Sequence, residues 1–304
     1  MIIRTVIVIA GIAVVVLGRG LFFFKGSYTP PTTEMPTYEQ VIVSPAPIYQ
    51  FSDNVSENAG KTVLIDLAHG NNFEMEQING LLQRLIARGM AVRLLNDGDN
   101  LKKELLGEEK KTETADEKEK SATENQTKKV KPLPDALVVI SPEDEFNKEE
   151  KDAIDEFVDN GGRLLLINDP GRGSSINEIA LEFGLIFESD YLYNQKENEI
   201  NFRNIYVTEF KDNDITKNLK KIVLYVSGSI SSADAGIAFV DQNTHSSVIE
   251  SRKRLSPMAL AEKSKVLAVN DLSFVTEPYS AAFDNNRLVA NIADWIAKAS
   301  VTRK

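Results

Sequence analysis

The sequence predicts an α/β domain with a parallel sheet, placed behind one N-terminal transmembrane helix. Two observations lead to this fold class. An apolar run at residues 5–24 has the ~20 residues that a helix needs to cross a bilayer. Beyond residue 61, apolar runs typical of buried strands alternate with amphipathic stretches of helical period. Repeated strand–helix–strand units favour parallel strands with helices on both faces of the sheet.

Composition excludes several classes of function. The chain has 304 residues and is 42% hydrophobic, which is enough to bury a sizeable core. Its 45 acidic and 35 basic residues give a formal net charge of −10. With no basic stripe interleaved with aromatic residues, this charge disfavours nucleic acid as a partner. The sequence contains no cysteine, which excludes disulfides, thiolate metal ligands and a cysteine nucleophile.

Residues 1–26 are interpreted as a membrane anchor that contacts lipid through residues 5–24. Arg19 lies near one end of the apolar run, where its long side chain can reach the interface. A cleaved signal peptide is the alternative. No small-residue cleavage site follows the run, which is also long for the apolar part of a signal peptide. The sequence therefore favours an uncleaved anchor.

Two segments of biased composition stand out, one before the domain and one within it. Residues 27–60 are rich in proline and predict an extended stalk. Residues at about 107–134 carry mixed charge with few apolar side chains. Such a segment cannot bury enough apolar surface to fold, so we expect a disordered insertion, with a docking tail as the alternative. The α/β domain is thus expected to span residues 61–300.

Two strand–helix–strand units are predicted first. The strand at 62–67 precedes Asn71 and Glu74, which resemble a capping box, and a strand at 91–95 completes the unit. The apolar residues of the intervening helix are Ile78, Leu81, Leu82, Leu85 and Ile86. The second unit has strands at 135–141 and 163–168 around a helix that begins near Asn147, with Ile154, Phe157 and Val158 facing inward.

The pattern is less regular after residue 169. We expect a helix and a short strand within 175–187, and strand or loop at 201–210. Strand-like runs follow at 221–230 and 236–241. A last buried strand at 265–270 precedes a closing helix at 285–299, which places Leu288, Ile292 and Trp295 on one face.

Polar residues stand where the predicted strands end. Asp66 and His69 follow the first strand, and Ser141, Asp169 and Asp271 end later ones. Ligands of open α/β sheets bind beyond these carboxyl ends. His69 could act as a general base oriented by a carboxylate, with Ser141 as nucleophile. Alternatively, His69 and two aspartates could hold a divalent cation.

Turn formation explains the same residues more simply. Asp66 can bind loop amides, His69 can donate to a main-chain carbonyl, and Asn71 can cap a helix. Ser141 and Asp169 each precede a proline. No established hydrolase, nucleotide or zinc motif accompanies them, so we favour the turn interpretation and predict neither a metal nor a cofactor. The candidate ligand-binding residues are His69, Asn71, Asp169 and Asp271.

One further stretch, DPGRG at residues 169–173, combines two glycines with an arginine. It could cradle an anion, although it lacks a phosphate-binding motif aligned with a helix.

Four stretches together resemble a known family: VLIDLAHGNNF at 63–73, DALVVISPEDEF…NDPG at 135–171, NFRNIYVTEFKDNDITKNL at 201–219 and VLAVNDLSF…ADWI at 266–296. They resemble class I glutamine amidotransferase-like domains of uncharacterised prokaryotic membrane proteins, similar to ABC-transporter auxiliary proteins of the gliding-motility type. More distantly, they resemble the amino-terminal domain of an intraflagellar-transport scaffold. The resemblance implies a flavodoxin-like or amidotransferase-like sheet over about residues 61–298.

The sequence departs from that family at the reactive position. Class I amidotransferases place a cysteine after the strand that here covers 163–168, whereas this chain has Asn168, Asp169 and Pro170. The late histidine–glutamate pair is also missing, because Ser246 and Ser247 follow His245. Glutamine hydrolysis by that route is therefore excluded.

The function expected from these features is non-catalytic. We expect a single-pass protein of the cytoplasmic membrane with an extracytoplasmic domain, acting as a binding or scaffold subunit. ABC permease and ATPase subunits, or other membrane proteins, are the candidate partners. The alternative is a hydrolase that uses His69, Asp66 and Asp169.

Overall fold

The structure is a computed structural model that describes residues 2–24, 60–107, 131–196, 202–249 and 254–302. The chain divides into two compact units, Met1–Thr37 and Tyr38–Lys304, and each is described by itself. The expected stalk at 27–60, apart from its last residue, lies outside the described residues. So do residues 108–130 of the expected charged insertion.

The described part of the first unit is one apolar helix, α1 (Ile2–Phe24). Its segment Ile3–Phe22 has a mean hydropathy of 2.3, and none of it is buried against protein. A helix of 20 such residues is long enough to cross a bilayer. The structure is therefore consistent with the single-pass anchor that the sequence predicts.

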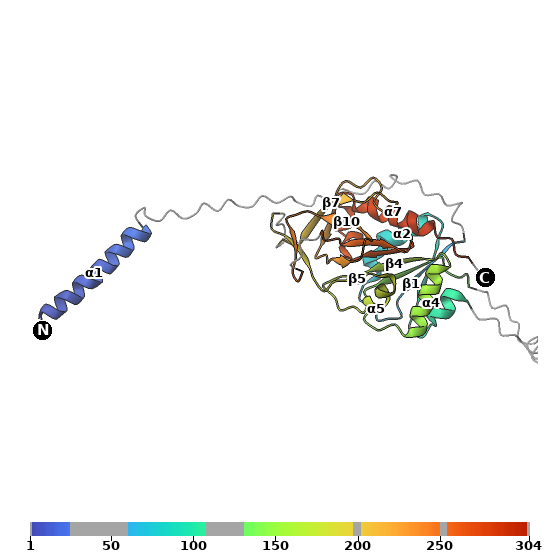
Figure 1. The fold of residues 1–304 in the computed structure, drawn as a ribbon, viewed down its shortest axis with the longest axis horizontal. Helices are drawn as coiled ribbons and strands as arrows, with labels where there is room; N and C mark the ends of the chain where they lie inside the picture. Colours follow the sequence, from blue (N-terminus) through green and yellow to red (C-terminus); the bar gives the residue numbers. More distant parts are fainter. Residues whose placement is uncertain (1, 25–59, 108–130, 197–201, 250–253, 303–304) are drawn as a thin grey trace, which may run out of the picture. The chain divides into compact units, whose positions relative to one another are not determined.

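The second unit is built on a nine-stranded mixed sheet with the order β2-β1-β3-β4-β13-β12-β10-β7-β8 (Figure 1). Its first five strands run parallel to one another: β2 (Ala91–Leu95), β1 (Thr62–Asp66), β3 (Ala136–Ile140), β4 (Arg163–Ile167) and β13 (Val266–Val269). The other four continue the sheet in antiparallel pairs: β12 (Met258–Ala261), β10 (Gly236–Val240), β7 (Asn204–Phe210) and β8 (Ile222–Tyr225).

Two small antiparallel ribbons lie outside the main sheet. One pairs β5 (Ile186–Phe187) with β9 (Ile230–Ser231), and the other pairs β6 (Leu192–Asn194) with β11 (Thr244–Ser246). His245 is an exposed residue of β11.

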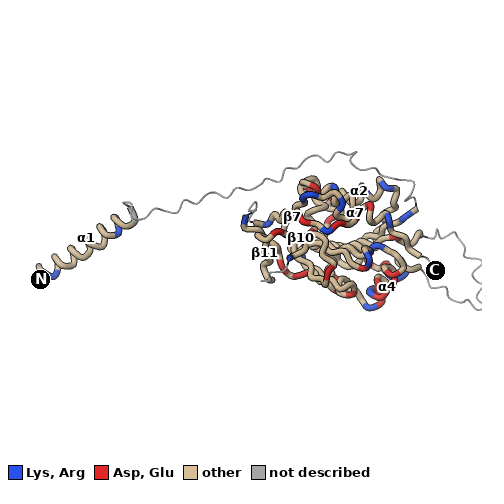
Figure 2. The backbone as a smooth tube through the Cα atoms, turned by 45° about the horizontal axis from the view of Figure 1, so that its top comes forward, with Lys and Arg blue, Asp and Glu red and all other residues tan. Residues whose placement is uncertain are grey.

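Helices cover both faces of the sheet, as the alternating pattern predicts (Figure 1 and Figure 2). On one face, α2 (Asn79–Ala87) and α7 (Asn285–Ala297) pack against Val63 and Ile65. On the other, Leu64 packs with α3 (Leu101–Leu106), α4 (Lys148–Asp159) and α5 (Asn177–Ala180). The remaining short turns of 3-10 helix are η1 (Met75–Ile78), η3 (Leu181–Phe183), η4 (Ser273–Val275) and η5 (Tyr279–Ala281).

The parallel half of the sheet confirms the sequence prediction. Strand-like runs were also expected where β8 and β10 form, but the antiparallel pairing of this half of the sheet was not predicted. Strands β1, β3, β4 and β13 are each a continuous apolar run with every, or nearly every, residue buried. The antiparallel strands carry a weaker signal. Strand β12 in particular has four residues of sequence MALA, with its last two half-buried.

Two details of the first helical segment differ from the prediction. Glu74, and not Asn71, is the N-cap residue of η1, and its main-chain N–H donates to Gln77 Oε1 at 2.9 Å. Asn71 instead turns its side chain back toward β1 and β3. Ile86 was expected in the core but is 60% exposed.

Candidate functional site

Two groups of polar side chains lie beyond the carboxyl ends of the parallel strands. The first, called here the His69 turn, consists of Asp66, His69 and Asn71 after β1. The second, called the Arg172 pocket, is formed around Asp169 and Arg172 after β4. The candidate residues are thus distributed between two separate arrangements.

Asp66 organises the His69 turn and is almost completely buried. Its Oδ1 lies 2.9 Å from His69 Nδ1 and also accepts from the main-chain N–H of Ala68 at 3.1 Å. Its Oδ2 accepts from Asn71 Nδ2 at 3.2 Å. The same Asn71 amide donates to the carbonyl of Ile140 at 3.0 Å, which ties the turn to the end of β3.

The imidazole of His69 is enclosed between two carboxylates and an aromatic ring. It stacks on Phe146 with a centroid distance of 3.7 Å, and its Nε2 lies 3.5 Å from Glu150 Oε2. Burial lowers the pKa of His69, but the hydrogen bond and charge of Asp66 together with Glu150 outweigh it. The pKa is therefore raised above its ordinary value. Since both ring nitrogens face carboxylates, neither is aimed at Ser141.

Ser141 ends β3 in the left-handed region of backbone conformation, with φ of 39°. It is fully buried, and its Oγ accepts from the main-chain N–H of Asp169 at 3.1 Å. Its own N–H donates to the carbonyl of Ile167 at 2.9 Å. Ser141 therefore connects the loops that follow β3 and β4.

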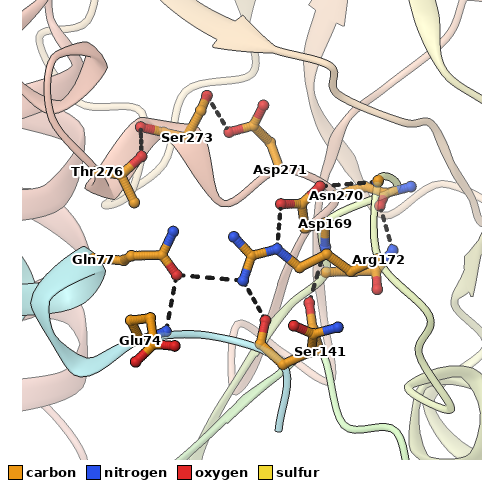
Figure 3. Close-up of polar contacts among 12 residues, drawn as sticks. Glu74, Gln77, Ser141, Asp169, Arg172, Asn270, Asp271, Ser273 and Thr276 are labelled. Atoms are coloured by element: carbon orange, nitrogen blue, oxygen red, sulfur yellow. Dashed lines mark hydrogen bonds and ion pairs between the residues drawn. The ribbon is translucent and has the colours of Figure 1, made fainter.

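Asp169 fixes the orientation of Arg172 (Figure 3). Its Oδ2 lies 2.9 Å from Arg172 Nε, and its Oδ1 accepts from the main-chain N–H of Gly171 at 2.9 Å. Arg172 Nη1 donates to Gln77 Oε1 at 3.3 Å and to the carbonyl of Asn72. The loop after β4 is thereby joined to the loop and 3-10 turn after β1.

An open pocket of about 460 Å³ lies beside this ion pair. Its most distinctive apolar surface is a stacked pair, Tyr225 and Tyr279, with a centroid distance of 5.3 Å and an interplanar angle of 14°. The residues that line the pocket are Gln77, Asp169, Gly171, Arg172, Arg203, Tyr225, Val226, Leu272, Ser273, Thr276, Glu277, Pro278 and Tyr279. Charged, amide and aromatic groups together are the surroundings that specific small-ligand sites use.

Asp271 is buried behind the wall of the pocket, with 1% of its surface exposed. Burial raises its pKa to about 7, and the nearby charge of Asp169 acts in the same direction. Three donors oppose this shift: Ser273 Oγ at 2.7 Å, Phe274 N at 3.0 Å and Tyr225 N at 2.9 Å. Ser273 and Tyr225, which donate to Asp271, also line the pocket. A change in the protonation of Asp271 therefore alters hydrogen bonds in the pocket wall.

The candidate site residues that the sequence predicted therefore have different places in the structure. His69, Asp66 and Asn71 form one turn, Ser141 links two loops, and Asp169 lines the pocket. Among the residues that the structure describes, no group of three or more His, Asp and Glu side chains is placed to hold a metal ion.

Several pocket residues were missed from the sequence. The DPGRG stretch did draw attention to Arg172 as a possible anion ligand. Gln77 lay within a predicted helix with no sign of a site. Arg203, Tyr225 and Tyr279 are brought to the pocket by the antiparallel pairing of β7 with β8 and by η5. The sequence predicted a strand-like run around Tyr225, but neither this pairing nor η5.

Comparisons with known proteins agree with this fold. The mmIFT52 N-terminal domain is similar in structure, with a TM-score of 0.58 and 12% identity over 79% of this chain and 99% of that one. At such low identity, the similarity concerns the fold alone.

Two other solved structures are more distant. A putative thua-like protein from Parabacteroides merdae ATCC 43184 has a TM-score of 0.42, with 14% identity over 80% of this chain and 92% of that one. The exo-beta-1,4-mannosidase Op5Man5 from Opitutaceae bacterium strain TAV5 has a TM-score of 0.38, with 11% identity over 80% of this chain and 36% of that one. No curated protein matches the sequence.

A family model described as "Domain of unknown function (DUF4350)" matches residues 103–293. The matched stretch contains β3, β4, the antiparallel strands and most pocket residues, while the His69 turn and Gln77 precede it. Since it covers more than half of the 304 residues, the chain belongs to the DUF4350 family.

Proposed function

We propose that this protein is a membrane-anchored, non-catalytic binding or scaffold protein whose α/β domain holds its ligand or partner at the Arg172 pocket. One observation carries the proposal. His69 and Asp66, the candidate base and its orienting acid, bind each other in a buried turn, whereas Asp169 and Arg172 line an open pocket. A pocket with fixed polar groups is suited to binding.

The strand order supports the same interpretation. The parallel strands follow the order β2-β1-β3-β4-β13, which is the 2-1-3-4-5 order of flavodoxin-like sheets. In the amidotransferase-like branch that the sequence resembles, the nucleophile follows the strand equivalent to β4. Here that position holds Asn168, Asp169 and Pro170. A fold that lacks the nucleophile of its relatives but has a formed pocket is best explained as a binding module.

We extend the proposal to a place in the cell. The apolar helix α1 provides a single-pass anchor in the cytoplasmic membrane, with the domain on the extracytoplasmic side. The resemblance to ABC-transporter auxiliary proteins favours permease and ATPase subunits as partners. The arrangement does not favour the alternative hydrolase, because His69 Nε2 faces Glu150 and Asp169 faces Arg172.

The test uses the full-length protein, affinity-purified from detergent-solubilised membranes of its native host. Co-purifying proteins are quantified by mass spectrometry for the wild type, for Arg203→Gln in the pocket and for His69→Gln in the turn. We expect transporter subunits to co-purify with the wild type and with His69→Gln, and to be reduced at least tenfold with Arg203→Gln.

The same preparations are assayed with chromogenic esters, amides, glycosides and phosphate esters. We expect no turnover above that of the buffer. Turnover that is lost in both His69→Gln and Asp169→Asn would overturn the proposal in favour of the hydrolase, because those residues belong to separate structural groups and share only a catalytic role.

A further inference from the structure

The Arg172 pocket presents a set of hydrogen-bond donors with few acceptors to balance them. Gln77 is the first. Its Oε1 accepts from the main-chain N–H of Glu74 at 2.9 Å and from Arg172 Nη1 at 3.3 Å. These two donors determine which way the amide faces, so its Nε2 is directed away from Arg172. Figure 3 shows this nitrogen on the side of Ser273 and Thr276. Among the described residues, no acceptor binds it.

Arg172 is the second donor. Its Nε is bound by Asp169, and its Nη1 is bound by Gln77 and by the carbonyl of Asn72. Within the described part of the chain, its Nη2 has no partner. A guanidinium fixed on two of its nitrogens and open on the third is preorganised to bind an oxygen of a ligand.

Arg203 is the third donor and sets the charge of the pocket. Its guanidinium lines the pocket, is exposed, and forms no ion pair or hydrogen bond with another described side chain. The charge of Arg172 is compensated by Asp169 at 2.9 Å. Glu277, at the exposed rim, has no described partner either. Among the described residues that line the pocket, Arg203 is therefore the cation that is available to neutralise a ligand.

The hydroxyl groups in the wall do not add to the donors of the pocket. Ser273 Oγ donates to Asp271 Oδ1 at 2.7 Å, and Thr276 Oγ1 donates to the carbonyl of Ser273 at 3.0 Å. Their protons are used within the wall. The apolar surface beside the donors is the stacked pair Tyr225 and Tyr279, which offers a face to a planar group.

We propose that the Arg172 pocket binds a small oxyanion, a carboxylate or a phosphate, attached to a planar or apolar group that packs on Tyr225 and Tyr279. The oxyanion is bound by Arg203, by Nη2 of Arg172 and by Nε2 of Gln77. Asp169 is a positioning residue that holds Arg172. The inference rests on the proposed function, since it names the ligand class of that site.

Full-length protein in detergent is titrated by calorimetry with benzoate, phenyl phosphate, acetate and benzamide. We expect benzoate or phenyl phosphate to bind and neutral benzamide not to bind. Acetate should bind at least tenfold more weakly than benzoate, because it lacks the planar group. A preference between benzoate and phenyl phosphate distinguishes a carboxylate from a phosphate ligand.

Four variants test the assigned roles. Arg203→Gln and Gln77→Leu should each weaken binding of the preferred probe at least tenfold. Tyr279→Leu should weaken benzoate but leave acetate unchanged. Asp169→Asn should lower the affinity and reduce its discrimination against benzamide, because it loosens the orientation of Arg172.

The matched control is Arg254→Gln, which removes an arginine from a second cavity, of about 640 Å³, lined also by Lys211 and Phe239. It should bind the probes as the wild type does. Equal loss in Arg254→Gln and Arg203→Gln would show non-specific attraction of anions and would overturn the inference.

Two other outcomes separate this inference from the proposed function. If no probe binds, yet Arg203→Gln still releases the membrane partner, the small-oxyanion ligand is wrong and the binding function stands. If phenyl phosphate binds and phenol is released, the ligand class is supported and the non-catalytic function is overturned.

Discussion

At the scale of single residues, the side chains at the strand ends differ in whether their hydrogen bonds are completed within the turn. Asp66 and His69 complete theirs with each other, with Asn71 and with Glu150. Such a network stabilises two loops and offers little to a ligand. Gln77 and Arg172 complete only part of theirs, and they lie beside open space. The sequence cannot distinguish these cases, because an Asp-x-x-His pattern and an Asp-x-x-Arg pattern both fit a turn.

Asp271 gives the first residue-scale prediction, the pH dependence of stability. Its pKa is raised to about 7 in the folded protein, so it stays protonated there at pH values where the unfolded chain has lost the proton. This contribution to stability is fully present below the unfolded pKa, and it is lost as the pH rises toward 7. Between pH 5 and 8, we expect the free energy of unfolding of the wild type to fall by about 2 kcal/mol relative to that of Asp271→Asn.

Urea unfolding followed by the fluorescence of Trp295, the single and buried tryptophan, measures this difference at each pH. His69, whose pKa is also raised, contributes in the same direction, but its effect is common to both proteins and cancels in the comparison. Parallel stability curves for wild type and Asp271→Asn would mean that Asp271 is ionised in the folded state throughout this range.

At the scale of elements, continuous apolar runs and the helix start at Asn147 were predictable, and the short strands were not. β1, β3, β4 and β13 are buried on both faces, so their runs of Val, Ile and Leu identify them without further context. β6 and β11 have three residues each and pair with one another across a long stretch of sequence, and β12 has four residues. The site was missed for a related reason: Tyr225 ends β8 and Arg203 precedes β7, and the antiparallel pairing of these two strands was not predicted.

The second prediction concerns the cap of α4. Asn147 Oδ1 accepts from the N–H of Glu150 at 3.1 Å, and Glu150 Oε2 accepts from the N–H of Asn147 at 2.9 Å. Asn147→Ala removes the first bond and leaves a donor at the helix start without its partner. We expect a loss of about 1 kcal/mol in the free energy of unfolding.

Lys148→Ala is the control, because Lys148 is exposed in the same turn and makes no cap. Its effect should stay within about 0.5 kcal/mol. Both variants are measured by urea unfolding. Equal stability of Asn147→Ala and wild type would show that packing of Ile154 and Phe157 alone determines where this helix begins.

At the scale of the whole molecule, one chain combines an α/β domain with an apolar helix that is long enough to cross a membrane. The whole chain has a net charge of −10, which disfavours association with anionic surfaces. Within the domain, the sheet changes from parallel to antiparallel at β13, and the Arg172 pocket takes residues from both halves. The pocket is thus a product of the complete sheet, which explains why no single sequence motif marks it.

The last prediction concerns the anchor. Because Ile3–Phe22 forms a helix of mean hydropathy 2.3 with nothing buried against protein, the wild type should sediment with membranes and resist extraction by carbonate and high salt. In the double variant Ile12→Arg and Val15→Arg, each charge near the middle of the span adds about 2.5–3.5 kcal/mol to the free energy of membrane insertion. This variant should appear largely in the soluble fraction, with the fold of the domain retained, as judged by the fluorescence of Trp295. Terminal sequencing of the membrane-bound wild type should begin within the first few residues. A soluble wild-type form that begins after residue 24 would mean that the helix is a cleaved signal and that the domain is secreted.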